Sequence, residues 1–600
     1  MPPKLSNIKK ANMKRKAVKN KTNEEIGSTE TWLMSFDAPF KIILSARFFA
    51  AFLVHITDCD ETFNYWEPTH YFMFKSGFQT WEYSPTYALR SYLYILMHAV
   101  PVYLYQSIFS TRKLMLFYMV RCMLALICSF CEIYFYRVLH QKFGSYLAKY
   151  YLIISVFSPG MFIASAAYLP SSFSMYMTFL SIGAWYSDNF EFAIFTTAIS
   201  TFLSWPFSGL IGFPLACDIV LRQKKYGLFI KWCLISLASI LTYQIAIDSY
   251  LYGKVVIAPF NIVFYNIFTS HGPDIYGTEH WSFYIYNGIL NFNVAFILVI
   301  IAPFLVILNK ILSITGCRVL KQYKNNKQIN KWILYLSPLY LWMTIFIVQP
   351  HKEERFLFPV YPLISLASAV ILQYTISLLL HVFNLYVLNC SNVLGKLKIL
   401  GYTCFFVFFI LTGLSRSALL IKAYHAPLDI YKELSNESLI LPKSDVINVC
   451  VGKEWHRYPS SFFLPDYRWK MHFIRSEFRG LLPGRFHNDS MSKVKENYND
   501  QNKEEPDKYS DIRLCHFMID LDNDQSSDLE PNYSKESEWI IVKSLPFLNH
   551  QKTPLLFRVF YIPFFWEDKA HFSSYNLLMR KSKENANSQS TKSSPIYYAF

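Results

Sequence analysis

QPHKEERFLFPVYP, residues 349–362, places five consecutive ionisable side chains at the start of a long apolar run. They are His351, Lys352, Glu353, Glu354 and Arg355. Charge beside a bilayer is costly to desolvate and usually marks function. The plainer alternative is a charge cluster that anchors a helix end at the membrane surface. Because a cluster with two carboxylates is a poor anchor, we expect something polar and anionic to meet the membrane here.

The composition around this stretch is that of an integral membrane protein. Of 600 residues, 53% are hydrophobic and 18% aromatic, while only 17% are charged, below the share typical of soluble domains. The net charge of +16 comes from a basic N-terminal arm, residues 1–37, and from short connectors between apolar runs. That distribution is typical of cytosolic loops and not of a nucleic-acid interface. We expect the arm to be disordered and cytosolic, and we expect no nucleic-acid partner.

Hydrophobic runs long enough to cross a bilayer recur along the chain. A span needs roughly 20 apolar residues, and about eleven runs meet that criterion. They lie at 40–57, 87–109, 114–138, 147–168, 170–187, 190–220, 226–249, 282–308, 331–348, 355–384 and 398–422. Alternating their direction places most basic connectors in the cytosol, as the positive-inside rule requires. The 58–86 connector and the 351–355 cluster then share the luminal side. We therefore predict an all-α polytopic membrane domain over residues 38–425.

The connector 58–86 begins DCDETFNYWEP and carries three carboxylates directly after the first run. They belong to Asp58, Asp60 and Glu61. At such spacing, burial and like-charge repulsion raise the pKa of at least one of them, as a general base near neutral pH requires. A solvated acidic loop is the plainer alternative, but the interleaved aromatic residues predict a segment at the membrane interface. Aromatic rings beside carboxylates and amides also suit sugars.

Four segments of the sequence resemble the lipid-linked-sugar mannosyltransferases of glycosyltransferase family 22. They are DETFNYWEPTHY at 60–71, TWEYSPTYALRSY at 80–92, HKEERFLFPVYP at 351–362 and CVGKEWHRYPSSFFLP at 450–465. Within that family, the DCDETFNYWEP and CVGKEW forms are most similar to the endoplasmic-reticulum α-1,2-mannosyltransferases of N-glycan precursor assembly. The resemblance implies the C-type glycosyltransferase architecture, a helical membrane bundle whose catalytic carboxylate lies in the first luminal loop.

The resemblance also implies a reaction. Its donor is dolichyl-phosphate mannose and its acceptor is dolichyl-diphosphate oligomannose, and an α linkage formed from a β-linked donor requires inversion. A single displacement needs one base and cationic help for the departing phosphate. No nucleotide sugar, cofactor or metal is implied, so we interpret Asp58-Cys59-Asp60 as a source of carboxylates and not as a metal motif. Whether one or two mannoses are added is left open, although the resemblance favours two.

The expected roles of individual residues follow the family pattern. Asp60 is the favoured general base, Asp58 is the alternative, and Glu61 orients Asp60 or holds a sugar hydroxyl. The residues expected to bind the donor phosphate are Arg355, as a fork, Lys352, as a point charge, and His351. The residues expected to contact substrate are Glu353, Glu354, Asn64, Tyr65, Trp66, Glu67 and Trp81.

After residue 425 the composition becomes polar, which predicts a small mixed α/β luminal domain over 426–600. Segments 445–451, 539–542 and 555–561 have the residue content of strands. A disulfide between Cys450 and Cys515 is left open, since it depends on an oxidising compartment. In the membrane part, we interpret the break at Trp205-Pro206-Phe207 as a packing kink, with a broken helix that lines a lipid groove as the alternative. We expect the connector 254–281 to cover the site.

Two other functions remain as alternatives. A glycosylphosphatidylinositol mannosyltransferase shares HKEERF-like segments and differs in its acceptor lipid. A multi-span lipid or solute transporter also buries charge among its helices, but such proteins usually contain repeated halves, and the sequence shows no internal repeat. We expect an enzyme of the endoplasmic-reticulum membrane with a cytosolic N-terminus.

Overall fold

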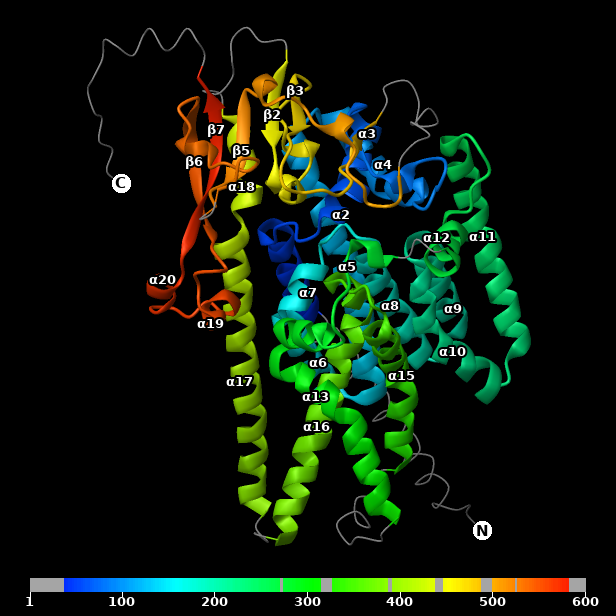
Figure 1. Ribbon diagram of the computed structural model, residues 1–600. Coiled ribbons are helices and arrows are strands. Elements are labelled where there is room, and N and C mark those ends of the chain that lie inside the picture. The colour runs from blue at the N-terminus through cyan, green and yellow to red at the C-terminus, as the bar shows by residue number, and fades with distance from the viewer. Residues whose placement is uncertain are drawn as a thin grey trace, which may run out of the picture.

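The computed structural model describes residues 37–269, 273–314, 326–386, 391–436, 446–486, 499–523 and 526–581. A bundle of helices carries a β-sheet domain at one end, and the longest helices extend away from that domain to the opposite end (Figure 1). The basic arm predicted at 1–37 lies outside the described residues except at its last position.

Within the described ranges, six helices are long and apolar enough to cross a membrane. They are α5 (Lys113–Phe143), α11 (Tyr226–Tyr252), α13 (Phe283–Ile314), α15 (Asn326–Val348), α16 (Tyr361–Tyr386) and α17 (Ser391–Tyr424). The other helices of this region are one at 37–53, α4 (Tyr92–Phe109), α6 (Ser145–Phe157), α7 (Pro159–Ala164), α8 (Pro170–Tyr186), α9 (Phe190–Ile199), α10 (Phe213–Cys217) and α12 (Ala258–Phe268).

Proline explains why several of the predicted runs are divided. Pro159 and Pro170 each begin a new helix, because a proline is tolerated in the first turn while the residue before it is driven out of the helical conformation. Pro206 likewise ends the run that starts at Phe190 and opens a 3₁₀ segment. The polytopic, largely helical class is thus confirmed, whereas the count of about eleven spans stays a prediction.

A buried ion pair holds the first helix inside the bundle. Arg47 Nε lies 2.9 Å from Glu132 Oε2 on α5, and neither side chain is exposed. Ser155 on α6 completes the contact, since its hydroxyl donates to Glu132 and accepts from Arg47. Removing one partner of such a pair leaves an uncompensated buried charge, so the three helices are strongly linked.

The C-terminal region forms a five-stranded mixed sheet in the order β3-β2-β5-β7-β6. The strands are β2 (Ile447–Val451), β3 (Trp469–Phe473), β5 (Phe517–Leu521), β6 (Trp539–Leu548) and β7 (Phe572–Arg580). Strands β3 and β5 flank β2 in parallel, whereas β7 pairs antiparallel with β5 and β6. A disulfide joins Cys450 to Cys515, which settles the pairing that the sequence left open.

One predicted strand is wrong. Residues 555–561 contain α19 (Leu555–Val559), followed by α20 (Trp566–Lys569), and do not join the sheet. The segment docks on α17 instead, because Ser415 Oγ donates to the Tyr561 carbonyl at 2.7 Å and Tyr561 N–H donates to the Ser415 carbonyl at 3.2 Å. Tertiary contact therefore overrides the strand propensity of its residues.

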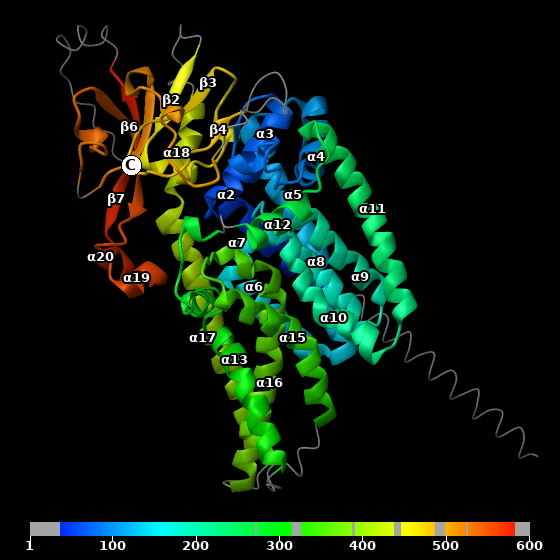
Figure 2. The same cartoon turned by 45° about the vertical axis from the view of Figure 1, so that its right-hand side comes forward.

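The first connector is attached to the C-terminal domain. Its elements are α2 (Cys59–Glu61), α3 (Glu67–Phe74) and β1 (Phe78–Gln79), and β1 pairs antiparallel with β4 (Gly484–Arg485). After α17 the chain continues through α18 (Ala426–Lys432) into the sheet. Figures 1 and 2 both place α2 and α3 beside this domain, at the end of the helix bundle that carries the sheet. The first connector is therefore positioned where the two parts of the molecule meet.

Candidate active site

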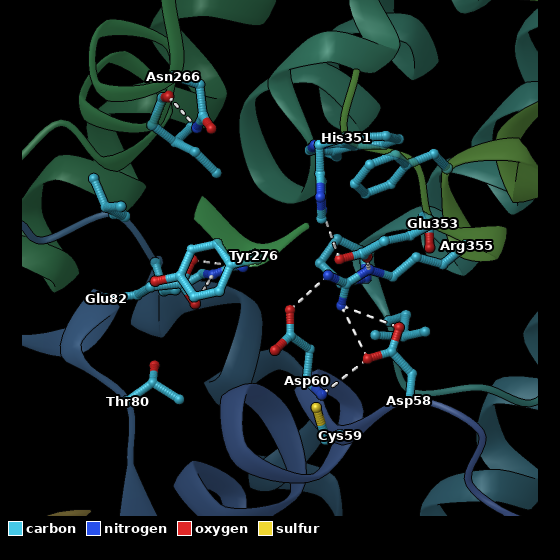
Figure 3. A pocket seen from close by; sticks show the side chains of 18 of the residues that line it. Asp58, Cys59, Asp60, Thr80, Glu82, Asn266, Tyr276, His351, Glu353 and Arg355 are labelled. Atoms are coloured by element: carbon cyan, nitrogen blue, oxygen red, sulfur yellow. Dashed lines mark hydrogen bonds and ion pairs between the residues drawn. The ribbon is translucent and has the colours of Figure 1, made fainter. Parts of the chain in front are cut away.

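A cavity of about 680 Å³ opens where the first connector, the membrane helices and the C-terminal domain come together. This volume is in the range of sites that enclose a small organic ligand. Its walls come from the first connector, the break after α9, α12 with the following loop, the segment 345–356, and C-terminal residues between 455 and 502. Figure 3 shows the polar part of this cavity.

Arg355 joins the two sequence segments at the floor of the cavity. Its Nη2 lies 2.6 Å from Asp60 Oδ2, and its Nη1 lies 3.3 Å from the Asp58 carboxylate (Figure 3). Asp58 and Asp60 share one side because Asp58 caps α2, where its Oδ1 accepts from the Asp60 backbone N–H at 2.9 Å. An aspartate at this position is a preferred helix cap. Residues 295 positions apart in the chain thus form one ionic centre.

The backbone of the 351–355 cluster determines which side chains reach that centre. At Glu353 the chain is extended, with φ −133° and ψ 152°, and a 3₁₀ helix begins at Glu354. Across this change of backbone, His351, Glu353 and Arg355 line the cavity. The intervening Lys352 and Glu354 are directed elsewhere.

Glu353 and His351 support the guanidinium. Glu353 Oε2 pairs with Arg355 Nε, while Glu353 Oε1 lies 3.0 Å from His351 Nε2. Burial acts to raise the pKa of Glu353, but the neighbouring Arg355 and His351 lower it to about 2, so this carboxylate is ionised. Burial acts to lower the pKa of His351, yet its hydrogen bonds to Glu353 and to the Gly277 carbonyl hold that pKa above the ordinary value. These surroundings shift the protonation equilibrium of His351 toward the cation, and its Nδ1 contact with Gly277 fastens the loop at residue 277 to the site.

The pKa of the Asp58 carboxyl is shifted in the opposite direction from that of Glu353. Burial raises the pKa of Asp58 to about 7, with Arg355 opposing the shift and Glu353 and Asp60 adding to it. A carboxyl that ionises near neutral pH can exchange a proton under working conditions. This property was predicted for the acidic group as a whole, and the structure attaches it to Asp58.

A second polar group lies on the wall of the same cavity. Arg90 forms a bidentate pair with Glu82, at 2.8 and 3.1 Å, and donates to the Tyr65 hydroxyl at 2.7 Å. Asn64 Nδ2 donates to Glu82 at 2.7 Å, while Asn64 Oδ1 accepts from Thr80. The sequence interpretation assigned roles to Asn64 and Tyr65 but overlooked Glu82 and Arg90, although both belong to the quoted TWEYSPTYALRSY segment.

Aromatic side chains cover much of the remaining surface. They are Phe63, Tyr65, Trp81, Trp205, Phe207, Tyr265, Tyr276, Phe346, Phe356, Trp455 and Phe478. Trp205 and Phe207 show that the break in the α9 run does more than kink a helix, because Pro206 turns the chain so that both rings face the cavity. Tyr265 and Tyr276 come from the connector that was expected to cover the site. Such rings suit both sugars and isoprenoid chains.

Two charged residues of the 351–355 cluster do not line the cavity. Lys352 is 6% exposed, and its ammonium donates to the Glu279 carbonyl at 2.9 Å and to the carbonyls of Gln349 and Pro350. Glu354 accepts a hydrogen bond from Asn291 on α13 at 2.9 Å. These positions favour a framework role for both side chains over the predicted contact with phosphate or acceptor.

Three residues of the first connector are also turned away from the cavity. Glu61 accepts hydrogen bonds from Trp66 Nε1 and from the backbone N–H of Tyr168, both at 3.0 Å. Glu67 accepts from the backbone N–H and hydroxyl of Ser461 and from the Phe78 N–H, and burial raises the pKa of Glu67 to about 7. These contacts favour roles in positioning the connector for Glu61, Trp66 and Glu67.

The acidic motif Asp58-Cys59-Asp60 brings three possible metal ligands close together. One ligand atom each of Asp58, Cys59 and Asp60 can come within 4.8 Å of the others. Arg355 already supplies a fixed positive charge to both carboxylates. Because a metal ion would compete with that guanidinium, the expectation that no metal is required is retained as a prediction.

The fold and site together define a polytopic membrane protein with an ionic centre inside a large, aromatic-lined cavity. Residues 38–465 match the Alg9-like mannosyltransferase family, and the chain belongs to that family. It is 45% identical to the α-1,2-mannosyltransferase ALG9 of Mus musculus over 92% of this chain and 90% of that protein, and equally to that of Homo sapiens. The resemblance to glycosyltransferase family 22 and the prediction of a mannosyltransferase are thereby confirmed.

Two further matches are weaker. GPI mannosyltransferase 3 of Debaryomyces hansenii is 27% identical over 59% of this chain and 61% of that protein. Among solved structures, ArnT from Cupriavidus metallidurans bound to undecaprenyl phosphate matches with a TM-score of 0.44 and 11% identity, covering 74% of this chain and 86% of that one.

Proposed function

We propose that this protein is an inverting α-1,2-mannosyltransferase of the endoplasmic-reticulum membrane. It moves mannose from dolichyl-phosphate mannose to the dolichyl-diphosphate-linked oligomannose precursor of N-glycosylation, at two steps. Family membership supports the class of reaction. The single observation that carries the chemistry is the contact of Asp58 and Asp60 with Arg355 inside a large aromatic cavity.

The ionic centre supplies the two functions that an inverting transfer needs. Asp60 accepts the proton of the acceptor hydroxyl as that oxygen bonds to C1 of mannose, and the bond from C1 to the phosphate oxygen breaks. Arg355 stabilises the departing dolichyl phosphate. A guanidinium has five N–H donors, and three of those on Arg355 face described carboxylates. One N–H on each terminal nitrogen is left for the phosphate, so Arg355 can bind the donor lipid while it keeps its contacts with the carboxylates.

The wall opposite this centre is suited to the acceptor. The rings of Trp81 and Tyr265 lie 5.3 Å apart between centroids at an interplanar angle of 48°, and both line the cavity, where aromatic faces suit sugar rings. The paired Glu82 and Arg90 beside them offer fixed hydrogen-bond acceptors and donors for hydroxyl groups. We assign this wall to the oligomannose chain.

The proposal includes a topology and a division of the chain. The arm 1–37 lies in the cytosol, the catalytic membrane domain spans 38–425 with a C-type architecture and about eleven helices, and 426–600 lies in the lumen. The Cys450–Cys515 disulfide supports the last assignment, because disulfides persist in oxidising compartments. The site lies on the luminal side, where the C-terminal domain closes it.

A transfer assay with purified protein in lipid nanodiscs tests the function. We expect radiolabelled mannose to pass from dolichyl-phosphate mannose to dolichyl-diphosphate oligomannose, and an α-1,2-specific mannosidase to remove it. The Asp60→Asn variant serves as the inactive control. Transfer to a mannosylated glycosylphosphatidylinositol instead would establish the alternative acceptor. Movement of the donor lipid across the bilayer without any transfer would establish a transporter.

A further inference from the structure

The C-terminal domain carries an apolar projection that neither the cavity nor the reaction uses. It consists of residues 554–566, PLLFRVFYIPFFW, which we call the foot. The foot contains α19 and leads into α20, and both views place these two helices at the tip of the domain, against the side of α17 (Figures 1 and 2).

The foot has a packed inner side. Phe557, Tyr561 and Trp566 contact a small core that includes Leu419 and Ala423 of α17. Trp566 is 5% exposed, and its Nε1 donates to the Phe557 carbonyl at 3.0 Å. The foot is therefore a folded unit held in one position, and its outer side chains are presented in a defined direction.

The outer side is apolar and uncovered in the described structure. Leu555 and Leu556 are 70% and 53% exposed, and Phe564 and Phe565 are 94% and 64% exposed. Elsewhere in the described part of the domain, large exposed apolar side chains such as Tyr467 and Leu514 occur singly. Single residues of that kind are normal on protein surfaces, whereas a contiguous group marks an interaction surface.

The position along α17 identifies what covers this surface. Lys398 and Arg416 are eighteen positions apart with no charged side chain between them, which at 1.5 Å per residue is about 27 Å. That length matches the roughly 30 Å hydrocarbon thickness of a bilayer, so Arg416 marks the end of the hydrocarbon region. The foot docks at this level, because Arg416 Nη1 donates to the carbonyls of Arg558 and Val559 at 3.3 and 3.2 Å. Aromatic and apolar side chains that sit at this depth face lipid.

We propose that the foot inserts Leu555, Leu556, Phe564 and Phe565 into the phospholipid leaflet beside α17. The C-terminal domain is thereby fastened to the bilayer surface at a second point besides the chain connection through α18. Since Trp455 and Phe478 of this domain line the cavity, the lipid contact fixes the height of the cavity above the membrane.

A fluorescence experiment on the full-length protein in phosphatidylcholine nanodiscs tests the proposal. An environment-sensitive fluorescent amino acid replaces Phe564 in one variant and Tyr467, which is 81% exposed on the same domain, in the matched control. We expect phosphatidylcholine spin-labelled near the head group to cause a loss of fluorescence at position 564 and not at 467. Aqueous iodide should give the opposite pattern.

Two results would overturn the proposal, and neither depends on enzymatic activity. Quenching of position 564 by iodide to the same extent as position 467 would place the foot in water. Protection of position 564 from both iodide and spin-labelled lipid would show that protein, from another copy or another segment, covers the surface. Because Phe564 makes almost no internal contact, its replacement should leave the thermal unfolding transition unchanged, which serves as the folding control.

Discussion

Asp60→Asn is the substitution that most directly tests the proposed chemistry. The change is nearly isosteric and removes one negative charge and one proton acceptor. The local fold should persist, because the cap of α2 uses the Asp58 side chain and the Asp60 backbone N–H, neither of which changes. Arg355 keeps its contacts with Asp58 and Glu353. Losing one charge-assisted hydrogen bond should lower the free energy of unfolding by about 1.5–3 kcal/mol at most.

The expected loss of activity is much larger than the loss of stability. A positioned general base contributes roughly 10²–10⁴-fold to the rate, so kcat should fall by that factor. The KM for the donor should change little, since the phosphate contacts come from Arg355. Mannose transfer in nanodiscs at saturating donor, with product counted against folded enzyme, measures both constants.

Asp58→Asn is the matched control for this prediction. Asparagine caps a helix about as well as aspartate, so the structure of α2 is kept. If Asp60 is the base, Asp58→Asn should reduce kcat much less than Asp60→Asn does. The reverse order would transfer the role to Asp58. Near-normal turnover of Asp60→Asn would refute the assignment.

The pH dependence provides a separate test of the ionic centre. Burial raises the pKa of Asp58 to about 7, so Asp58 is protonated below that pH and gains its charge above it. An ionised Asp58 adds a further negative charge beside Arg355, where it favours loss of the proton from the acceptor hydroxyl. We expect kcat/KM to rise with pH through about 7 in the wild type and this rise to be absent in Asp58→Asn. An identical rise in both proteins would exclude Asp58 as its cause.

Three further predictions concern the surroundings of the centre. Arg355→Lys keeps a positive charge but loses the planar set of guanidinium donors, so kcat should fall about 10²-fold, as on removal of one transition-state donor. The control Arg479→Lys, on the exposed surface, should leave kcat unchanged. Glu82→Gln weakens the bidentate pair with Arg90 and should raise the KM for acceptor but not for donor, as measured by varying each lipid in turn. Glu67→Ala leaves the buried backbone N–H groups of Phe78 and Ser461 unpaired. It should lower the free energy of unfolding, measured by denaturant titration, by about 2–5 kcal/mol. The kcat per folded molecule should be unchanged.

The sequence alone was sufficient for the class, the family and the pairing of two distant segments. Apolar runs and their basic connectors are local properties of the chain, so a membrane protein with 58–86 and 351–355 on one side could be predicted without coordinates. The contact of Asp58 and Asp60 with Arg355 agrees with that prediction. The helical content was also predictable, whereas the helix at 555–559 was not, because its docking on α17 involves residues far away in sequence.

Only the tertiary structure decided which side chains of each segment face the cavity. Both Lys352 and Arg355 are cations in one short motif, yet Arg355 lines the cavity, whereas the Lys352 ammonium donates to the Glu279 carbonyl outside it. Glu82 and Arg90 join the site because the first connector folds back on itself, and composition carries no record of that path. The charge and hydropathy of a residue are properties of its own side chain. The direction of that side chain depends on backbone angles, which contacts with distant residues determine.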